Sequence, residues 1–252
     1  MKSILITGGS GKVGFQLVKH FLEKNFIVVT TTRNQVSFEE KLIPKLDKEN
    51  ISNLNVIEVD FTKDEAIDTI TSYLGKKGID IESIIHNARC LDFLKIEDDN
   101  SISKKNFEGE FYLDVIFPYH LNLGIIKEQE TVLKNIVFVS SIYGVVAPTP
   151  HLYEDFHKSS PINYGVSKAA QIHLTKELAV RLGPETRVNC VSLGGIKGRT
   201  NEEFVKKYNK LTPLNKMLEE IDVVAPIEFL ISESSLNMTG QNLIIDGGWT
   251  IW

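Results

Sequence analysis

The chain is poor in the residues that build disulfide scaffolds and metal clusters. Its only cysteines among 252 residues are Cys90 and Cys190. Neither belongs to the closely spaced Cys and His pairs that hold zinc, so we expect no disulfide framework and no metal site. No apolar run approaches the roughly 20 residues of a membrane span. The first apolar stretch is interrupted at Thr7 too early for a signal peptide. These absences predict a cytoplasmic protein with no membrane partner.

The chain also lacks an excess of positive charge. The chain has 28 Lys and Arg residues against 33 Asp and Glu residues, which gives a formal net charge of -5. A nucleic-acid surface normally requires a clustered excess of positive charge. We therefore expect no nucleic-acid partner. No linker, repeat or low-complexity tract divides the chain, and its length suits a single domain over residues 1–252.

Short apolar runs rich in β-branched residues alternate with amphipathic helical patterns. Continuous apolar runs are typical of strands that are covered on both faces, as in a parallel sheet. The expected strands are Ile4–Ile6, Phe26–Thr31, Val56–Val59, Ser83–His86, Ile136–Ser140, Arg187–Ser192 and Leu243–Ile245. After a first helix behind Gly11, the expected helices are about Asp64–Leu74, Asn106–Lys127, Asn163–Leu182 and Asp222–Ser232. This alternation predicts an α/β Rossmann fold with a doubly wound, parallel seven-stranded sheet flanked by helices.

A glycine-rich stretch, TGGSGKVG, follows the first expected strand. It is not a P-loop, because that motif would need glycine at Ile6 and a hydroxyl at Val13. Its glycines instead form G-x-x-G-x-x-G, which lets the backbone approach a pyrophosphate at a helix N-terminus. A plain strand-to-helix turn is the alternative. We predict a dinucleotide site whose residues here are Gly8, Ser10, Gly11, Lys12, Val13 and Gly14.

The end of the second strand favours NADP(H) over NAD. Threonines stand where an NAD-binding carboxylate would contact the ribose 2′-hydroxyl, and Arg33 follows them, where it suits a 2′-phosphate. Lys12 adds a second cation, although both residues can also be ordinary surface groups, which leaves NAD open. Asp60 and Phe61 end the third strand as further cofactor contacts. The Asp60 carboxylate either accepts a hydrogen bond from adenine or caps the next helix.

Two pairs fit the pattern Y-x-x-x-K. Tyr73 and Lys77 lie beside glycines where a helix is expected to end, so we interpret this pair as a surface coincidence. Tyr164 and Lys168 open a long helix, one turn apart on one face. The reference pKa of tyrosine is about 10, and a nearby lysine cation favours the phenolate. Ser141 ends the fifth strand, at the sheet edge where ligands bind, and suits a substrate carbonyl. A helix-initiating tyrosine and a capping serine are the alternative.

Together these segments resemble the compact, single-domain branch of the short-chain dehydrogenase/reductase family over nearly the whole chain. The matching pieces are TGGSGKVG, VDFT, HNA, VSSIYG, YGVSK, RVNCVSLGGI and LIIDGGW. The resemblance implies hydride transfer between a nicotinamide and a carbonyl or secondary alcohol. It implies that Ser141 positions the carbonyl, that Tyr164 donates or accepts the proton, and that Lys168 holds the ribose. It further implies cofactor contacts by Asn87, Ala88 and Ile196.

Several positions depart from the family pattern. Lys12 stands where the compact branch has glycine, and Leu193 stands where proline is usual. Asp114 replaces the asparagine of the family's proton relay, and we expect it to hold a relay water beside Lys168. These departures keep a second hypothesis open, a non-catalytic NADP-binding sensor or scaffold relative.

Arg89 is a further departure, because the family has glycine at this position. A guanidinium suits phosphate or carboxylate, so we predict an anionic, sugar-like substrate: a sugar phosphate, a nucleotide sugar or a sugar acid. The alternative is that Arg89 pairs with Asp92 or with the acidic run at 97–99. The irregular segment Val145–Pro161 is expected to be a long loop, and it loosely resembles members from surface-polysaccharide and flagellin-glycosylation pathways. Its expected anion-closing residues are His151, His157 and Lys158.

The expected helices Asn106–Lys127 and Asn163–Leu182 carry more apolar surface than one sheet face covers. In the resembling family these helices build a dimer face, and tetramers are common. We therefore predict a homodimer or homotetramer, with burial of every aromatic in the core as the alternative. The residues concerned include Phe107, Phe111, Tyr112, Ile116 and Tyr119.

Overall fold

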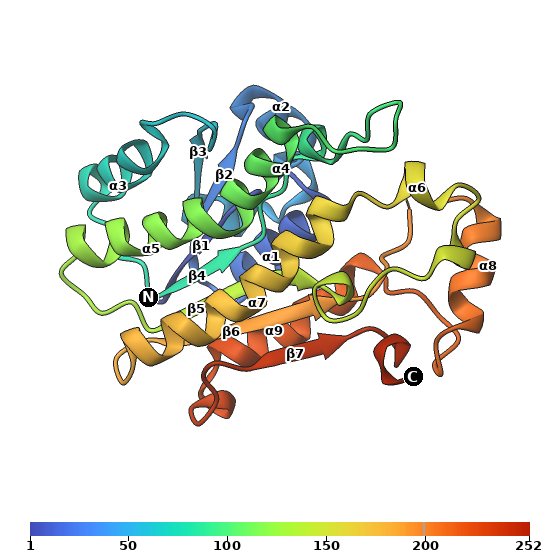
Figure 1. The fold of residues 1–252 in the computed structure, drawn as a ribbon. Helices are drawn as coiled ribbons and strands as arrows, with labels where there is room; N and C mark the ends of the chain where they lie inside the picture. Colours follow the sequence, from blue (N-terminus) through green and yellow to red (C-terminus); the bar gives the residue numbers. More distant parts are fainter. Residues whose placement is uncertain (199) are drawn as a thin grey trace.

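One seven-stranded sheet runs through the computed structural model, which describes residues 1–198 and 200–252. Its strands are β1 Ser3–Ile6, β2 Ile27–Thr32, β3 Leu54–Glu58, β4 Ser83–His86, β5 Asn135–Ser141, β6 Arg187–Leu193 and β7 Asn242–Ile245. The order is β3-β2-β1-β4-β5-β6-β7, and every neighbouring pair is parallel (Figure 1). The order reverses beside β1, which creates the switch point where such sheets bind ligands. The predicted doubly wound α/β fold is confirmed.

Helices cover both faces of the sheet. They are α1 Lys12–Glu23, α2 Gln35–Lys41, α3 Ala66–Lys77, α4 Lys104–Phe111, α5 Phe117–Glu128, α6 Phe156–Ser159, α7 Ile162–Leu182, α8 Glu202–Lys210 and α9 Val224–Ile231. Successive side chains of a strand point to opposite faces. Leu5 therefore packs with α3, α5 and α7, while Ile4 and Ile6 pack with α1 and α9. Hydrophobic residues dominate the buried core on each face, as the continuous apolar strand runs predict.

A proline interrupts the predicted helix Asn106–Lys127. The segment contains α4, a π-helical turn at Tyr112–Ile116 and then α5. Pro118 has no N–H to donate to the carbonyl of Asp114, so the regular hydrogen-bond ladder cannot continue through it. The Gln171 amide on α7 donates to that carbonyl instead, at 3.2 Å. The wide turn therefore fixes Asp114 against α7.

Several elements were not predicted from the sequence. Helices α2 and α8 are short and largely exposed, and Phe38 is the one fully buried side chain of α2. Segment 145–161, predicted as a loop, contains a short turn at Pro150–Leu152 and the helix α6. Within the described ranges, no helix is both long and apolar enough to cross a bilayer.

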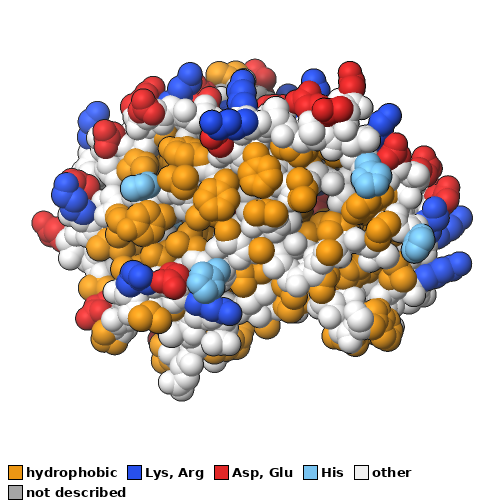
Figure 2. Space-filling view, in the orientation of Figure 1, with side chains coloured by type: hydrophobic (Ala, Val, Ile, Leu, Met, Phe, Trp, Pro, Cys, Tyr) orange, Lys and Arg blue, Asp and Glu red, His pale blue; other side chains and the backbone are white. Residues whose placement is uncertain are grey.

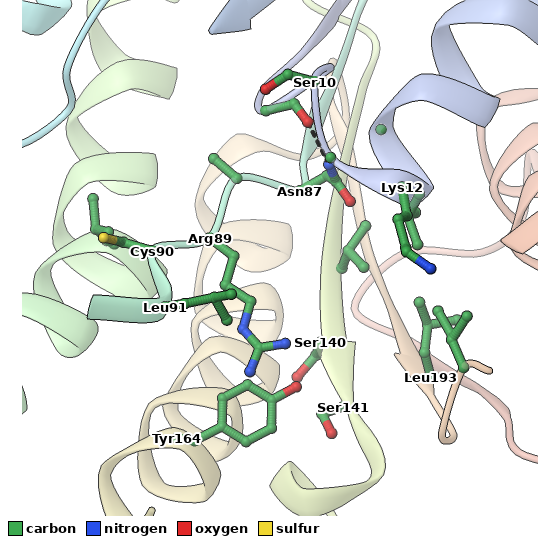
Figure 3. A pocket seen from close by; sticks show the side chains of 18 of the residues that line it. Ser10, Lys12, Asn87, Arg89, Cys90, Leu91, Ser140, Ser141, Tyr164 and Leu193 are labelled. Atoms are coloured by element: carbon green, nitrogen blue, oxygen red, sulfur yellow. Dashed lines mark hydrogen bonds between the residues drawn. The ribbon is translucent and has the colours of Figure 1, made fainter. Parts of the chain in front are cut away.

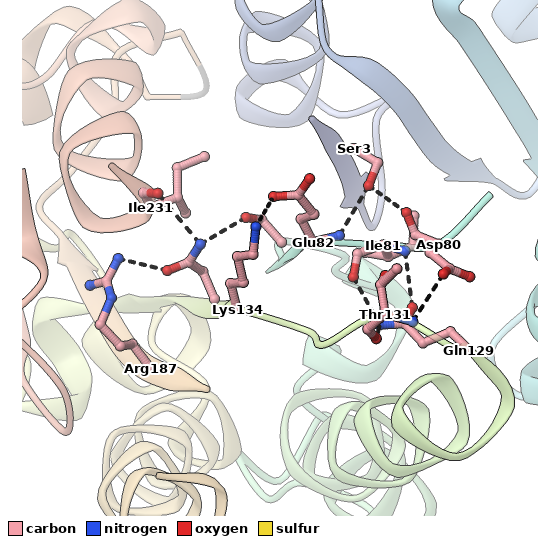
Figure 4. Close-up of polar contacts among 11 residues, drawn as sticks. Ser3, Asp80, Ile81, Glu82, Gln129, Thr131, Lys134, Arg187 and Ile231 are labelled. Carbon is pink, nitrogen blue, oxygen red and sulfur yellow. Dashed lines mark hydrogen bonds and ion pairs between the residues drawn. The ribbon is translucent and has the colours of Figure 1, made fainter. Parts of the chain in front are cut away.

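The amino ends of the strands are tied together by polar contacts (Figure 4). The Gln129 side chain bonds both backbone groups of Ile81, at 2.9 and 3.1 Å, and Lys134 pairs with Glu82 at 2.9 Å. Arg187 donates to the side-chain oxygen of Asn135 at 2.6 Å. These contacts join loops to strands at the amino edge of the sheet. The cavity described below lies at the opposite, carboxyl edge.

Candidate active site

A cavity of about 870 Å³ lies at the carboxyl edge of the sheet, within the size range of ligand pockets. Its wall contains every predicted cofactor residue and Arg89, together with Ser141, Tyr164 and Lys168. Asp114 is the exception, because it lies behind Lys168 and contacts the cavity only through that lysine. Segments far apart in the sequence therefore meet at one site.

The glycine loop is shaped for close approach of a backbone or ligand. Gly8 has φ +72°, and a Cβ there would lie 2.8 Å from the Cα of Ala88. A Cβ on Gly14 would lie 2.3 Å from the carbonyl oxygen of Gly8. Gly11 precedes the first turn of α1 and has no side chain to cap it. The free N–H groups of that turn consequently face the cavity, which fits a pyrophosphate.

Asn87 and Ala88 hold this loop against β4. The Thr7 hydroxyl accepts hydrogen bonds from both of their backbone N–H groups, at 2.9 and 3.0 Å. The Asn87 amide donates to the carbonyls of Thr7 and Gly8, at 3.1 and 3.3 Å. Both residues line the cavity where the resemblance predicts them. They support the loop as well as the wall.

Exposed cations line the cavity at two places, with Arg33 at its far end and Lys12 on the glycine loop, toward Gly198. Arg33 faces Asp92, with 3.7 Å between their charged atoms and exposed side-chain fractions of 63% and 81%. Lys12 pairs with Glu220 at 3.0 Å. Helix α2 begins just after Arg33, at the far end of the cavity. It adds two polar wall residues that sequence reasoning missed, Ser37 and Lys41. The sequence shows that the end of β2 has no carboxylate, but it does not show where α2 lies.

Asp60 adopts a local turn. Its Oδ1 accepts hydrogen bonds from the backbone N–H and the hydroxyl of Thr62, at 3.0 and 2.8 Å. The backbone bond from Thr62 is the main cause that lowers the pKa of Asp60. Helix α3 begins later, at Ala66, so the capping alternative is wrong. Phe61 follows and stacks on Phe117, with ring centroids 4.0 Å apart.

Ser141, Tyr164 and Arg89 converge at the inner end of the cavity (Figure 3). The guanidinium carbon of Arg89 lies 4.7 Å from the centre of the Tyr164 ring. The alternative in which Arg89 pairs with Asp92 is therefore wrong, since Asp92 faces Arg33 instead. The Ser141 hydroxyl accepts a hydrogen bond from the Tyr143 N–H at 3.2 Å. Ser141 thus caps a turn and also lines the cavity.

Lys168 is buried and forms an ion pair. Its Nζ donates to Asp114 Oδ1 at 2.8 Å, to the Val139 carbonyl at 3.3 Å and to Gln171 Oε1 at 3.4 Å. Burial alone would lower the pKa of Lys168, but the acidic groups around it, Asp114 first among them, together outweigh burial and raise that pKa. The two side chains thus contact each other directly, and the relay water expected beside Lys168 stays a prediction. A buried carboxylate needs a cation, and the lysine supplies it.

His86, at the end of β4, is neutral. It is 4% exposed, its Nε2 lies 2.8 Å from Asn122 Oδ1, and its ring stacks on Phe138. Burial lowers the pKa of His86 to about 4. This histidine therefore adds a packed polar contact behind the site and no positive charge.

Aromatic side chains form the wall next to Tyr164, and no sequence pattern predicts this grouping. Tyr143 and Tyr153 share a hydroxyl contact of 2.5 Å, and the Tyr208 hydroxyl accepts the Gly195 N–H at 2.7 Å. Burial raises the pKa of Tyr208 to about 12, so this phenol stays neutral. Tyr153 comes from the long segment 145–161. Among the described wall residues this tyrosine stands where three basic residues were expected, namely His151, His157 and Lys158.

The remaining predicted positions are placed simply. Ile196 lines the cavity and forms a parallel bridge with Leu218. Tyr73 and Lys77 lie at the end of α3, outside the cavity wall, with Nζ 5.9 Å from the ring centre. Within the described part of the chain, no group of three or more His, Cys, Asp and Glu residues is arranged to hold a metal ion.

Comparisons with known proteins agree with this geometry. The family model described as enoyl-(acyl carrier protein) reductase matches residues 10–250. Post-translational flagellin modification protein A of Campylobacter coli is 29% identical, over 98% of each chain. A short-chain dehydrogenase from Leptospira borgpetersenii with bound NAD+ is 30% identical, with a TM-score of 0.83 over 99% of this chain and 92% of that one. ElxO with NADP bound is 27% identical, with a TM-score of 0.82 over 100% and 99%.

The relatives thus include proteins solved with NAD+ and with NADP, and the family match covers nearly the whole chain. The glycine cradle at Gly8 and Gly14 provides the independent physical fit, because a side chain there would fill the space. The chain belongs to the short-chain dehydrogenase/reductase family and is an oxidoreductase that uses a nicotinamide cofactor.

Proposed function

We propose that this protein is an NADP(H)-dependent oxidoreductase that interconverts a carbonyl and a secondary alcohol on an anionic, sugar-like substrate. The observation that carries the proposal is the position of Arg89, a guanidinium over the Tyr164 ring at 4.7 Å. An anion held by Arg89 lies next to the hydroxyl that exchanges the proton. The tyrosine hydroxyls and aromatic faces of the wall suit a polyhydroxylated ring, which presents both hydroxyl and apolar C–H surface.

Each catalytic side chain has a distinct part in this reaction. Tyr164 exchanges a proton with the substrate oxygen, and Ser141 donates a hydrogen bond to that oxygen as charge develops on it. Lys168 and its partner Asp114 supply a fixed, buried charge pair beside Tyr164. A bound nicotinamide supplies or accepts the hydride. The glycine loop, Asn87 and Ala88 hold and orient that cofactor.

The preference for NADP(H) rests on charge at the outer end of the cavity. Arg33 provides a cation there, and the threonines of β2 provide no carboxylate to repel a 2′-phosphate. Lys12 adds positive charge at the glycine loop. The nearby solved relatives include both cofactor types, so the local charge decides the proposal. Dissociation constants for NADPH and NADH test it, and equal values would contradict the preference.

The substrate class is tested at Arg89. Nicotinamide absorbance is followed with a panel of sugar phosphates, nucleotide sugars, sugar acids and neutral ketoses. Arg89→Ala should raise KM for an anionic substrate at least tenfold more than for a neutral analogue, because only the anion loses an ion pair. An equal effect on both would defeat the anionic class. A matched control is Lys95→Ala, which removes a cation outside the cavity wall.

We also propose that the protein is a homodimer or homotetramer. Apolar side chains gather over α5 and α7 on the face seen in Figure 2. Those with at least 37% exposure include Ile116, Tyr119, Leu123, Ile126 and Val166. Such a contiguous patch is unusual on a monomer. Sedimentation at micromolar concentration should find an oligomer and Leu123→Glu should weaken it, whereas a monomer would refute the proposal.

A further inference from the structure

Glu110 is a buried carboxyl group that the reaction described above leaves without a part. It lies near the end of α4 and is 1% exposed. Within the described residues, its Oε1 has no hydrogen-bond partner, and neither has Asp114 Oδ2. Buried carboxylates are costly unless they are paired or protonated. Glu110 therefore needs a physical explanation that packing does not give.

The surroundings of Glu110 connect it to the catalytic lysine. Asp114 follows it by one helical turn, so both carboxyl groups share a face of the same helix. That face packs on α7, where Lys168 binds Asp114 at 2.8 Å. The charged groups that act on Glu110 are Asp114 from its own helix, Lys168 from α7 and Arg89 from the segment after β4.

Counting charge shows which group carries a proton. Lys168 is a single buried ammonium, and its best contact is taken by Asp114. A second ionised carboxylate would leave the buried group with a net negative charge. Burial, followed by the charge of Asp114, accordingly raises the pKa of Glu110 to about 7, although Lys168 and Arg89 act in the opposite direction. The raised pKa favours the protonated, neutral form of Glu110.

We propose that Glu110 holds the exchangeable proton of this catalytic cluster and serves as the proton reservoir for Tyr164. The proposal rests on the acid–base part assigned to Tyr164 above. A group that ionises near the working pH both accepts and returns protons readily. Glu110 is a positioning residue in this sense, since it acts on the reaction through the Lys168–Asp114 pair.

The proton balance is simple. In alcohol oxidation, the substrate C–H bond breaks and its electron pair leaves as hydride to the nicotinamide, which is the oxidant. The O–H bond breaks as well, and its proton passes to Tyr164. The site regains its starting state when one proton moves on to the Glu110 carboxylate, which becomes a neutral carboxylic acid and later loses the proton to water. Carbonyl reduction runs in reverse, with Glu110 as the source.

The direct test is a carbon-13 NMR titration of the side-chain carboxyl groups in the protein without ligand. We expect one buried resonance to titrate near pH 7 and to disappear in Glu110→Gln. The matched control is Glu108→Gln, which removes an exposed carboxylate from the same helix and leaves that resonance unchanged. A Glu110 resonance that titrates only below about pH 5, as an ordinary glutamate does, would overturn the proposal.

A second measurement reports proton movement when charge enters the cavity. NADP+ binding is followed by calorimetry at pH 7 in two buffers of different ionisation heat, which counts the protons released. We expect release in the wild type and in Glu108→Gln, and loss of most of it in Glu110→Gln. Equal release by all three proteins would overturn the proposal.

The two measurements also separate the two hypotheses. Failure to bind NADP+ or NAD+ contradicts the proposed function, while the NMR titration still decides Glu110. Should Glu110→Gln fail to fold, Asp114→Asn keeps Glu110 in place. There the Glu110 titration should move to lower pH, because a neighbouring negative charge is gone and Lys168 has lost its partner. If Glu110 titrates at the same pH in Asp114→Asn as in the wild type, the proposed coupling of Glu110 to Asp114 and Lys168 is wrong.

Discussion

The cavity has an Asp–cation pair at each end, and the two pairs differ in almost every physical respect. Arg33 and Asp92 lie 3.7 Å apart with more than half of each side chain in solvent. Lys168 and Asp114 lie 2.8 Å apart, with exposed side-chain fractions of 6% and 3%. The exposed pair contributes little and separates easily, whereas the buried pair is costly to break. One end can therefore exchange partners when a ligand arrives, and the other end stays fixed.

This contrast agrees with the chemistry assigned to each end. Recognition of a 2′-phosphate requires Arg33 to leave Asp92, and screening by water makes that exchange cheap. Proton transfer requires charges that do not move during the reaction. Burial and the π-helical turn hold Asp114 in place for that purpose.

The largest expected effect comes from the reacting hydroxyl beside the fixed pair. Tyr164→Phe should lower kcat by about 10²- to 10⁴-fold, because it removes the proton that moves and keeps nearly the same shape. Cofactor affinity should change little. Stopped-flow and steady-state assays with an identified substrate measure the rate, and unchanged turnover would exclude Tyr164 as the acid or base.

Removing the aspartate of each pair compares how much the two pairs contribute to stability. Asp114→Ala should reduce the free energy of unfolding by about 3–5 kcal/mol, since the buried Lys168 ammonium loses the carboxylate that it contacts. Asp92→Ala, the matched exposed substitution, should change it by no more than about 1 kcal/mol. Urea unfolding of both variants provides the comparison. Similar losses would show that burial does not distinguish the two pairs.

Cofactor affinity provides the next effect in size. Arg33→Ala should weaken NADPH binding by about 1–3 kcal/mol, the range for a charge-assisted hydrogen bond, and leave NADH binding nearly unchanged. Fluorescence titration of both cofactors measures the difference. Lys19→Ala is the control, as it removes an exposed cation of α1 outside the cavity wall. A parallel loss for NADH would mean that Arg33 supports the fold and not the phosphate.

The smallest expected effect also concerns the exposed Arg33–Asp92 pair. Asp92→Asn should strengthen NADPH binding by less than about 1 kcal/mol, because Arg33 no longer has to leave an exposed partner. The effect should shrink at high salt, as expected of exposed charges. Titrations at low and high ionic strength measure it. Weaker binding in this variant would show that Asp92 helps to hold the cofactor.

The elements predicted best from the sequence are those with a strong local signal. Strands of a parallel sheet are buried on both faces, so their apolar runs, such as Ile4–Ile6, stand out without any partner being known. The glycine loop and the Tyr164–Lys168 spacing are likewise local patterns. The long helix α7 agrees with its predicted range to within one residue at its start.

Other features depend on contacts between distant residues. The consequence of Pro118 appears only when Gln171 satisfies the freed carbonyl of Asp114. Glu110 resembles any helical glutamate until α7 covers it. Tyr153 reaches the cavity wall because segment 145–161 folds back over it, and no periodic pattern in the sequence predicts that path. Contacts between residues that are far apart in the sequence determine these three features, and local sequence preferences do not reveal them.

The contrast between a movable and a fixed pair is tested most directly by a crystal structure of the protein with NADP+ bound. The account predicts that Arg33 has left Asp92 and contacts the 2′-phosphate, while Lys168 still lies within hydrogen-bond distance of Asp114 Oδ1. A complex in which Arg33 remains on Asp92, or in which the Lys168–Asp114 pair has separated, would contradict it.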